Sequence, residues 1–251
     1  MSRVLLVGES WFVYSIHQKG FDAFSTSEYS EGGTEFITVL ERAGHSVDYI
    51  PSHEIHARFP ATAGALAAVA DVVVISDVGA NSFQLSPDTF VKSRQTPDKT
   101  EVVREFVASG GGVLRVGGYL TFTGIDAKAR WGVVPLADAL PVRLLERDDR
   151  VELPAGEAPQ VVAEHPIVRG LDSVWPALLG LNEITAKAGS EVIAECGGHP
   201  LLVVGDYGAG RSAAFTSDVA PHWAPEAFVQ WAGYQRLFDR TVSWLAGGDL
   251  S

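Results

Sequence analysis

The sequence predicts a doubly wound α/β domain, in which a mostly parallel β-sheet carries helices on both faces. Residues 3–8, 46–50 and 71–76 are short apolar runs rich in β-branched side chains, which is typical of buried parallel strands. Between the first two runs, residues 36–43 place apolar side chains at helical spacing, and Gly44 follows where a helix would end. This alternation requires crossover connections, which favour a parallel sheet covered on both sides.

The same order continues along the chain and favours a flavodoxin-like sheet. Residues 102–107 repeat the helical pattern, and three glycines at 110–112 turn the chain into a strand at 113–116. The tail adds three predicted strands and a last helix, at residues 191–196, 201–206, 211–216 and 228–245. We expect residues 1–251 to form a single domain.

Two stretches depart from this pattern. Residues 141–163 mix short apolar pieces with charges and prolines without a helical period, so we expect a small β excursion there. A connection of about 22 residues precedes the first helix, which is long for a compact domain. It is interpreted as a functional loop or, alternatively, as a lid or subunit contact without chemistry.

Composition limits the partners and the compartment. A formal net charge of −12 and a pI near 4.9 disfavour binding to nucleic acid or to anionic lipid. The single cysteine allows no internal disulfide, and the chain begins directly with a strand rather than with a signal peptide. Because no apolar run is long enough to span a bilayer, we expect a soluble cytoplasmic protein without a membrane partner.

Candidate site residues follow the predicted strands, because open parallel sheets bind ligands at the carboxyl ends of their strands. Four such groups are present, after the first, third, fourth and last strands of the predicted parallel core. They are Glu9, Ser10 and Trp11; Asp77 and Asn81; Gly117, Gly118 and Tyr119; and Asp218, His222 and Trp223.

Two of these groups suit acid/base catalysis. His222 follows Asp218 by four residues, so the pair could act as base and orienting acid or, alternatively, as metal ligands. A metal would need further ligands that no tight spacing specifies, so no metal site is predicted and the cofactor stays unknown. Glu9 follows a strand in an apolar context, where burial would raise its pKa and suit it to proton transfer. Alternatively, its carboxylate accepts hydrogen bonds from neighbouring backbone N–H groups and so holds the loop.

The turn after the fourth strand has two interpretations. Gly117-Gly118-Tyr119 stands where other α/β enzymes carry a nucleophile on a tight turn, but tyrosine is a poor nucleophile at neutral pH. The turn is therefore either structural or a place where backbone N–H groups bind an anion or a carbonyl. Cys196 ends a different predicted strand and is interpreted as a small buried hydrophobe.

Four segments carry a family resemblance, and together they extend over most of the chain: VLLVGESWF, DVVVISDVGAN, GGGVLRVGGYLTFTGIDAKARW and GRSAAFTSDVAPHW. The chain resembles the class I glutamine amidotransferase-like family, whose superfamily also holds the trehalose-utilisation-type proteins. The resemblance implies a flavodoxin-like fold. In glutaminases of this superfamily a cysteine at the turn is supported by a late histidine and an acid. Here the turn has no cysteine, while His222 matches the histidine and Asp218 substitutes for the acid.

Two functions remain open from the sequence. In the first, a protein without the nucleophilic cysteine binds or processes a small polar metabolite, such as a sugar or a carboxylate, in the strand-end crevice. In the second, a non-catalytic binding or scaffold module assembles as a homo-oligomer. Whether the protein is an enzyme is undecided, and glutaminase activity is not expected because no activated thiol is available at the turn.

Overall fold

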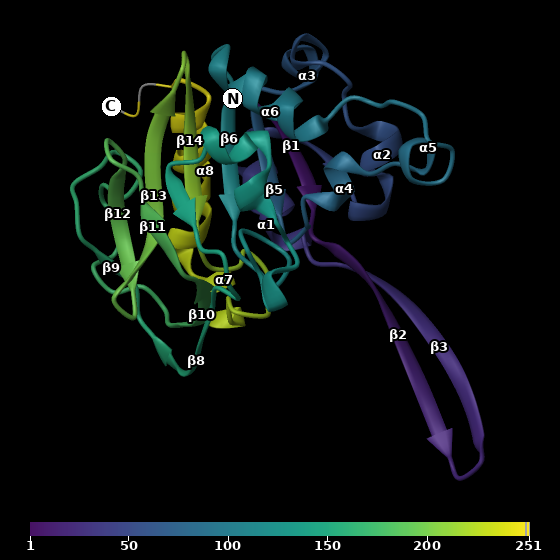
Figure 1. Cartoon of the computed structure of the whole chain (residues 1–251). Coiled ribbons are helices and arrows are strands. Elements are labelled where there is room, and N and C mark those ends of the chain that lie inside the picture. Colours follow the sequence, from purple (N-terminus) through teal and green to yellow (C-terminus); the bar gives the residue numbers. More distant parts are fainter. Residues whose placement is uncertain (249, 251) are drawn as a thin grey trace.

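The central feature of the computed structural model is an eight-stranded mixed sheet; the structure describes residues 1–248 and 250 (Figure 1). The strand order is β4-β1-β5-β6-β14-β13-β12-β9, in which the first five strands are parallel and the last three are antiparallel to their neighbours. The strands are β1 (Arg3–Gly8), β4 (Ser46–Ile50), β5 (Val72–Ser76), β6 (Gly112–Val116), β9 (Gln160–Val161), β12 (Glu191–Cys196), β13 (His199–Tyr207) and β14 (Gly210–Phe215).

Helices cover both faces of this sheet, and successive strand residues face opposite layers. On β1, Leu6 packs into the layer formed with α1 (Thr34–Arg42) and α8 (Ala232–Leu245). Its neighbour Leu5 packs into the layer formed with α3 and α6. The remaining helices are α2 (Ile55–Arg58), α3 (Ala63–Val69), α4 (Asn81–Gln84), α5 (Pro87–Phe90), α6 (Lys99–Ala108) and α7 (Glu226–Val229). The expectation of a flavodoxin-like, doubly wound sheet is confirmed.

The predicted final helix is interrupted, so the expectation of one helix over residues 228–245 was wrong. Trp231 has an extended backbone, and its indole N–H donates to Asp172 Oδ2 at 3.0 Å. A Cβ on Gly233 would lie 2.1 Å from the Trp231 ring, so only glycine fits there. The chain therefore ends α7 before this tryptophan and begins α8 after it.

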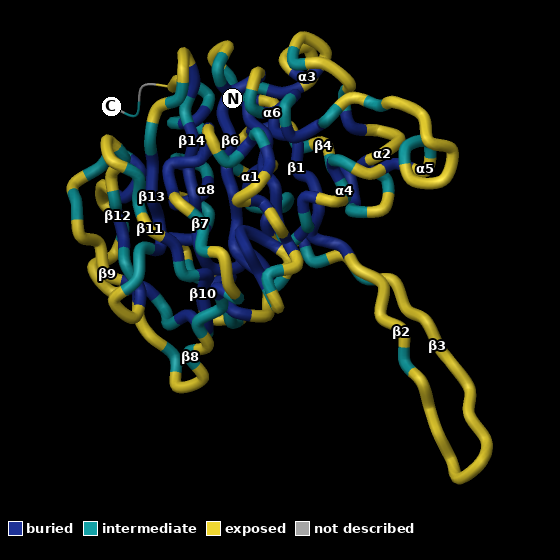
Figure 2. The backbone as a smooth tube through the Cα atoms, in the orientation of Figure 1, coloured by how far each residue is buried: buried dark blue, intermediate teal, exposed yellow. Residues whose placement is uncertain are grey.

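The long connection before α1 is a β-hairpin rather than a loop. Strands β2 (Ser10–Lys19) and β3 (Asp22–Glu31) pair along their full length and project from the body as an arm (Figures 1 and 2). Almost all of the arm is exposed. Since neither face packs on a core, the arm lacks the alternation of apolar and polar residues by which a half-buried strand is recognised.

Residues 141–163 hold three short strands that pair outside the main parallel set. They are β7 (Val142–Leu144), β8 (Arg150–Glu157) and β9. The first two pair with β11 (Ile184–Ala186) and β10 (Leu178–Asn182), respectively. In Figure 1, β8 and β10 lie at the same end of the sheet from which the arm leaves, while both chain ends lie at the opposite end. In the part of the chain that the structure describes, no helix is both long and apolar enough to cross a membrane.

Candidate functional site

Two acidic residues follow neighbouring parallel strands in an unusual backbone conformation. Glu9 follows β1 and Asp77 follows β5, and both have positive φ angles, 48° and 34°. Non-glycine residues adopt such angles at a cost of about 1–3 kcal/mol, and they cluster at functional sites. The ends of β1 and β5 thus each carry an acidic residue with a strained backbone, a feature that is typical of functional sites.

Glu9 is buried, and its surroundings favour the protonated form of its carboxyl group. Its side chain lies in the interior, where the Ser76 hydroxyl donates a hydrogen bond to Oε2. Burial raises the pKa of Glu9 well above 4.5, and the negative charges of Asp218 and Asp77 raise it further. Its backbone also holds the loop, because Glu9 N–H donates to Ser76 O and Glu9 O accepts from Gly32 N–H, both at 2.9 Å. The backbone of Glu9 thus holds the loop, whereas its carboxyl group accepts from the Ser76 hydroxyl rather than from a backbone N–H group as the alternative expected. Its role in proton transfer stays a prediction.

Asp77 is the second carboxyl group with a displaced titration. Burial raises its pKa from 3.8 to about 6, and the charge of Asp218 acts in the same direction. Its Oδ1 atom accepts a hydrogen bond from the Leu120 N–H at 2.6 Å. Near neutral pH this group exchanges its proton readily, which is the property a general base requires.

The Asp77 carboxyl group fills the space above the glycine turn. A Cβ built on Gly118 would lie 2.6 Å from Asp77 Oδ1, and the φ of Gly118 is +141°, a conformation that L side chains rarely adopt. Asn182 fixes this glycine from the other side: its Oδ1 accepts from the Gly118 N–H at 3.0 Å and its Nδ2 donates to Gly118 O at 3.1 Å. No side chain fits at this position without moving Asp77.

Three backbone N–H groups at the turn, those of Gly117, Gly118 and Leu120, are paired inside the protein. The Gly117 N–H donates to Phe215 O at 2.8 Å and to Ser217 O at 3.0 Å. As described, the Gly118 N–H is paired with Asn182 and the Leu120 N–H with Asp77. These three groups are therefore not available to bind an anion or a carbonyl, and the structural interpretation of the turn fits them better.

His222 and Asp218 form the hydrogen-bonded pair that their spacing suggested. Asp218 Oδ1 accepts from the backbone N–H groups of Val219 and Ala220 at 2.8 and 3.2 Å, which fixes the carboxylate. Its Oδ2 atom lies 3.3 Å from His222 Nδ1, and since a carboxylate only accepts, Nδ1 carries the proton. This hydrogen bond raises the pKa of His222 above 6.5. Asp218 is buried, whereas the imidazole is 44% exposed and can meet a ligand.

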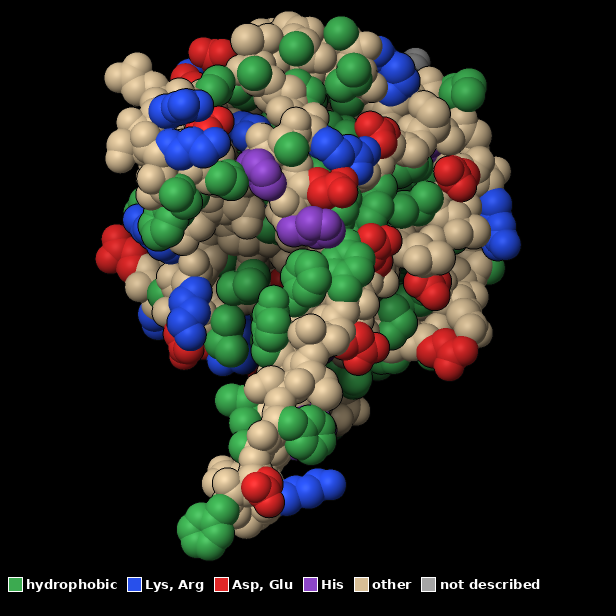
Figure 3. All heavy atoms as spheres, turned by 90° about the vertical axis from the view of Figure 1, so that its right-hand side faces the viewer, with side chains coloured by type: hydrophobic (Ala, Val, Ile, Leu, Met, Phe, Trp, Pro, Cys, Tyr) green, Lys and Arg blue, Asp and Glu red, His purple; other side chains and the backbone are tan. Residues whose placement is uncertain are grey.

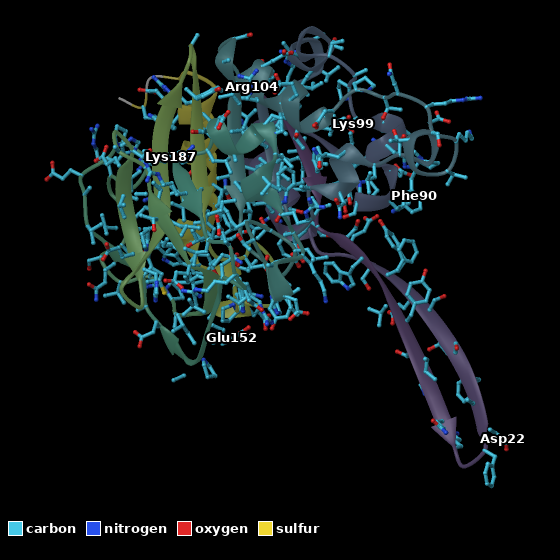
Figure 4. The ribbon with its side chains drawn as sticks, viewed as in Figure 1. Asp22, Phe90, Lys99, Arg104, Glu152 and Lys187 are labelled. Atoms are coloured by element: carbon cyan, nitrogen blue, oxygen red, sulfur yellow. The ribbon has the colours of Figure 1, made fainter. Side chains whose placement is uncertain are left out.

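Aromatic rings surround the histidine. Tyr119 meets the His222 ring edge-on, with centroids 4.4 Å apart, and Trp223 stacks on it at 5.4 Å. Glu152, from β8, holds both neighbours: its carboxylate oxygens accept from the Tyr119 hydroxyl and the Trp223 indole N–H, each at 3.0 Å. The Arg150 guanidinium lies 4.8 Å from the centre of the Tyr119 ring. Figure 4 places Glu152 at the lower end of the body, the end from which the arm leaves.

A cavity of about 370 Å³ opens between the root of the arm and the loop after β5. Ser10, Trp11 and Asp77 contribute to its lining, together with Phe12, Ser52, His53, Val78, Gly79, Ser82 and Leu120. Figure 3 views the molecule from the side on which the arm projects. A larger cavity, of about 590 Å³, lies along residues 161–169 and contains none of the predicted site residues.

The predicted residues thus separate into three sets. Ser10, Trp11 and Asp77 line the cavity, and Glu9 is buried beside them. The second set, Tyr119, Asp218, His222 and Trp223, forms the aromatic cluster, with the glycine pair 117–118 beneath. The third set is Asn81 alone, which is exposed at the start of α4 and does not line the cavity.

Sequence reasoning missed several residues that hold the site together. Asn182 and Asp149 form a buried pair at 2.9 Å, and Asp149 accepts from the N–H groups of Thr123 and Gly124 at 2.8 and 2.9 Å. Their segments show no periodicity that would place them near the turn. Among residues 1–248 and 250, no three histidine, cysteine or acidic side chains are arranged to hold a metal ion.

Arg115 was also missed, although its sequence position carries a signal. It is fully buried on β6, where it donates to Ile75 O and Val78 O, both at 3.1 Å, and stacks on the Trp131 ring at 4.0 Å. Its positive charge favours the ionised form of Asp77. An arginine inside an otherwise apolar strand is unusual and could have indicated a charged site nearby.

The fold and these groups define a flavodoxin-like α/β protein with an acidic crevice at its strand ends. Residues 3–247 match the family model described as "Putative glutamine amidotransferase". The chain belongs to this glutamine amidotransferase-like family. No curated protein matches it in sequence.

Solved structures agree with this assignment. A cytoplasmic protein of Salmonella typhimurium is 41% identical, with a TM-score of 0.94, over 97% of this chain and 98% of its own. A second, from Salmonella typhimurium LT2, is 44% identical, with a TM-score of 0.93, over 96% and 98%. A ThuA-like protein of Parabacteroides merdae shares the fold at 15% identity, with a TM-score of 0.58, over 98% and 90%.

Proposed function

We propose that this protein binds a small polar metabolite in the strand-end crevice and processes it by acid/base chemistry, without the nucleophilic cysteine of glutaminases. The observation that carries the proposal is the pair of buried carboxyl groups, Glu9 and Asp77, with raised pKa values next to the cavity. Carboxyl groups with different titrations in one site are suited to separate acid and base roles. Glu9 would donate a proton and Asp77 would accept one, with His222 as a further donor.

The charge of the crevice narrows the class of ligand. Asp218 adds a third acidic group to Glu9 and Asp77, and its charge raises the pKa of both. An anionic ligand would be repelled here, so of the two classes expected from the sequence a sugar fits better than a carboxylate. The exposed His222 edge and the Tyr119 ring beside it offer apolar faces on which a sugar ring could lie.

Thiol chemistry has no support in this geometry. Cys196 lies at the end of β12, three strands away from β6, and is 1% exposed. Burial raises the pKa of its thiol to about 11, so very little thiolate forms at neutral pH. At the turn itself, the Asp77 carboxyl group takes the space that a cysteine at position 118 would need.

The test is a screen of neutral sugars, amines and carboxylates for shifts in melting temperature, since a ligand that binds only the folded state raises it. We expect hits among neutral polyhydroxylated compounds. Glu9→Gln and His222→Asn should abolish their shifts, whereas Asp206→Asn, at an exposed carboxylate outside the site, should keep them. Hits that are all anionic, or shifts that survive both site substitutions, would overturn the proposal.

A second candidate function is a non-catalytic, homo-oligomeric module, and the exposed arm is the observation that favours it. It predicts assembly without ligand binding in the crevice. For either function we place the protein in the cytoplasm, the compartment named for both Salmonella proteins, and expect no nucleic-acid or membrane partner given the net charge of −12.

A further inference from the structure

The β2–β3 arm is an isolated two-stranded sheet. It pairs in register from Ser10 opposite Glu31 to Lys19 opposite Asp22, and Figure 4 places Asp22 at its far end. Only its root is anchored, where Ser10 Oγ accepts from the Ser52 N–H at 2.8 Å and the Phe12 ring meets His53. Because a lone hairpin is at best marginally stable in water, an arm of this length needs a surface to pack on.

One face of the arm is suited to such packing. Every second residue of a strand lies on the same face, so Phe12, Tyr14 and Ile16 share one side of the arm. Residues directly opposite them on β3 lie on that side too. Their exposed fractions are 49%, 76% and 80%, respectively. Between Phe12 and Tyr29 the rest of this face is uncharged: Gln18, Ala23, Ser25, Ser27 and Tyr29. Glu31 lies on this face at the root of the arm. The charged residues between 13 and 28 all lie on the opposite face: Lys19, Asp22 and Glu28.

The flank of the body next to the arm offers a complementary apolar surface. Phe90 and Val91 are 78% and 73% exposed, and Figure 4 shows Phe90 on the same side of the molecule as the arm. Leu85, also on this segment, is 45% exposed. Large apolar side chains gathered in this way are typical of protein interfaces.

We propose that two copies of this chain exchange their arms, so that the apolar face of each arm lies against the other copy's flank around Phe90. A second copy is the favoured occupant because a two-fold exchange makes the arm contact twice. Two chains of net charge −12 repel each other, but the face between Phe12 and Tyr29 carries no charge, so its burial adds no like-charge contact. The inference does not depend on the chemistry proposed for the crevice.

The dimensions of the arm decide between two modes of contact. Ten residues at about 3.4 Å each make the arm about 34 Å long, and two strands make it about 10 Å wide, so one face covers about 340 Å². Arm-to-arm contact alone would bury only about 680 Å², less than the roughly 1,200 Å² of a stable interface. If each arm instead lies on the partner's body, there are two such contacts, which together bury about 1,400 Å², so exchange onto the body is required.

The experiment is sedimentation velocity of the full chain across the micromolar range. We expect a dimer for the unaltered protein, and at least a tenfold weaker dimer for Ile16→Glu and for Phe90→Glu. Thr26→Glu places the same charge on the opposite face of the arm and should leave the dimer intact. Circular dichroism and melting temperature verify that each variant is folded.

Three outcomes would overturn the inference. The first is a chain that sediments as a monomer at every concentration, because a monomer cannot exchange its arm with a second copy. A dimer that persists when residues 13–28 are replaced by Asn-Gly, a two-residue turn joining Phe12 to Tyr29, uses another surface. Binding of the unaltered monomer to neutral phosphatidylcholine vesicles, lost in Ile16→Glu, would assign the face to a membrane instead.

Discussion

Asp77→Asn should stabilise the protein, and the size of the effect can be worked from its pKa. Asparagine keeps the shape of the side chain and can still accept the hydrogen bond from Leu120 N–H, but it carries no charge to desolvate. The burial that raises the Asp77 pKa to about 6 therefore costs the variant nothing. Asp77 is thus expected to lower the stability of the folded protein, as residues of acid/base sites often do.

The magnitude and the sign follow from linkage between folding and proton binding. Below the unfolded pKa, near 3.8, both states of the wild type carry the proton and ionisation does not affect stability. Between 3.8 and about 6 the unfolded chain loses its proton while the folded protein keeps it, so stability falls as the pH rises. At about 1.4 kcal/mol per pKa unit, the whole loss is about 3 kcal/mol and is complete above the folded pKa.

Urea unfolding of wild type and Asp77→Asn at a series of pH values from 4 to 8 measures this difference. We expect the smallest difference at the acidic end and a variant that is more stable by up to about 3 kcal/mol at pH 8. Asp206→Asn, at a side chain that is 81% exposed, serves as the matched control and should follow the wild-type curve. A variant no more stable than wild type at pH 8 would refute the description of Asp77 as a buried, unfavourably ionised group.

Four further predictions concern neighbouring groups. Gly118→Ala should destabilise the protein by about 1–3 kcal/mol in urea unfolding, through its positive φ and the contact with Asp77; an unchanged midpoint would contradict this. Asn182→Ala should cost about 2–3 kcal/mol by leaving the buried Gly118 N–H unpaired, and a loss below about 0.5 kcal/mol would contradict it. An NMR titration should give His222 a pKa above 6.5 that falls in Asp218→Asn; no change between the two proteins would rule out their hydrogen bond. Cys196→Ser should leave ligand-induced melting shifts unchanged, and glutamine-dependent ammonia release lost in this variant would show that the thiol reacts.

Much of the parallel sheet could be predicted because burial on both faces leaves a direct mark on the sequence. The strands β1, β5 and β6 are almost wholly apolar, and the segments between them carry helical spacing. The arm could not be predicted in this way, because its strands contact no core and so are under no constraint to alternate.

The site was predictable only as far as topology determines it. Parallel strands end at one edge, so residues after β1, β5 and β14 had to be close, and the charge of Asp218 does raise the pKa values of both Glu9 and Asp77. Glu152 and Asn182 come from β8 and β10, whose pairing joins segments with no shared signal in the sequence. Asn81 was nominated on proximity in sequence alone, and α4 turns it toward solvent.

The most direct test of the proposed crevice is a crystal structure of the protein with the strongest ligand from the melting-temperature screen. We expect the ligand in the cavity between Trp11 and Asp77, within hydrogen-bond distance of the Asp77 carboxyl group. Density for the ligand in the larger cavity along residues 161–169 or beside Cys196, with the strand-end crevice empty, would contradict the proposed location of function.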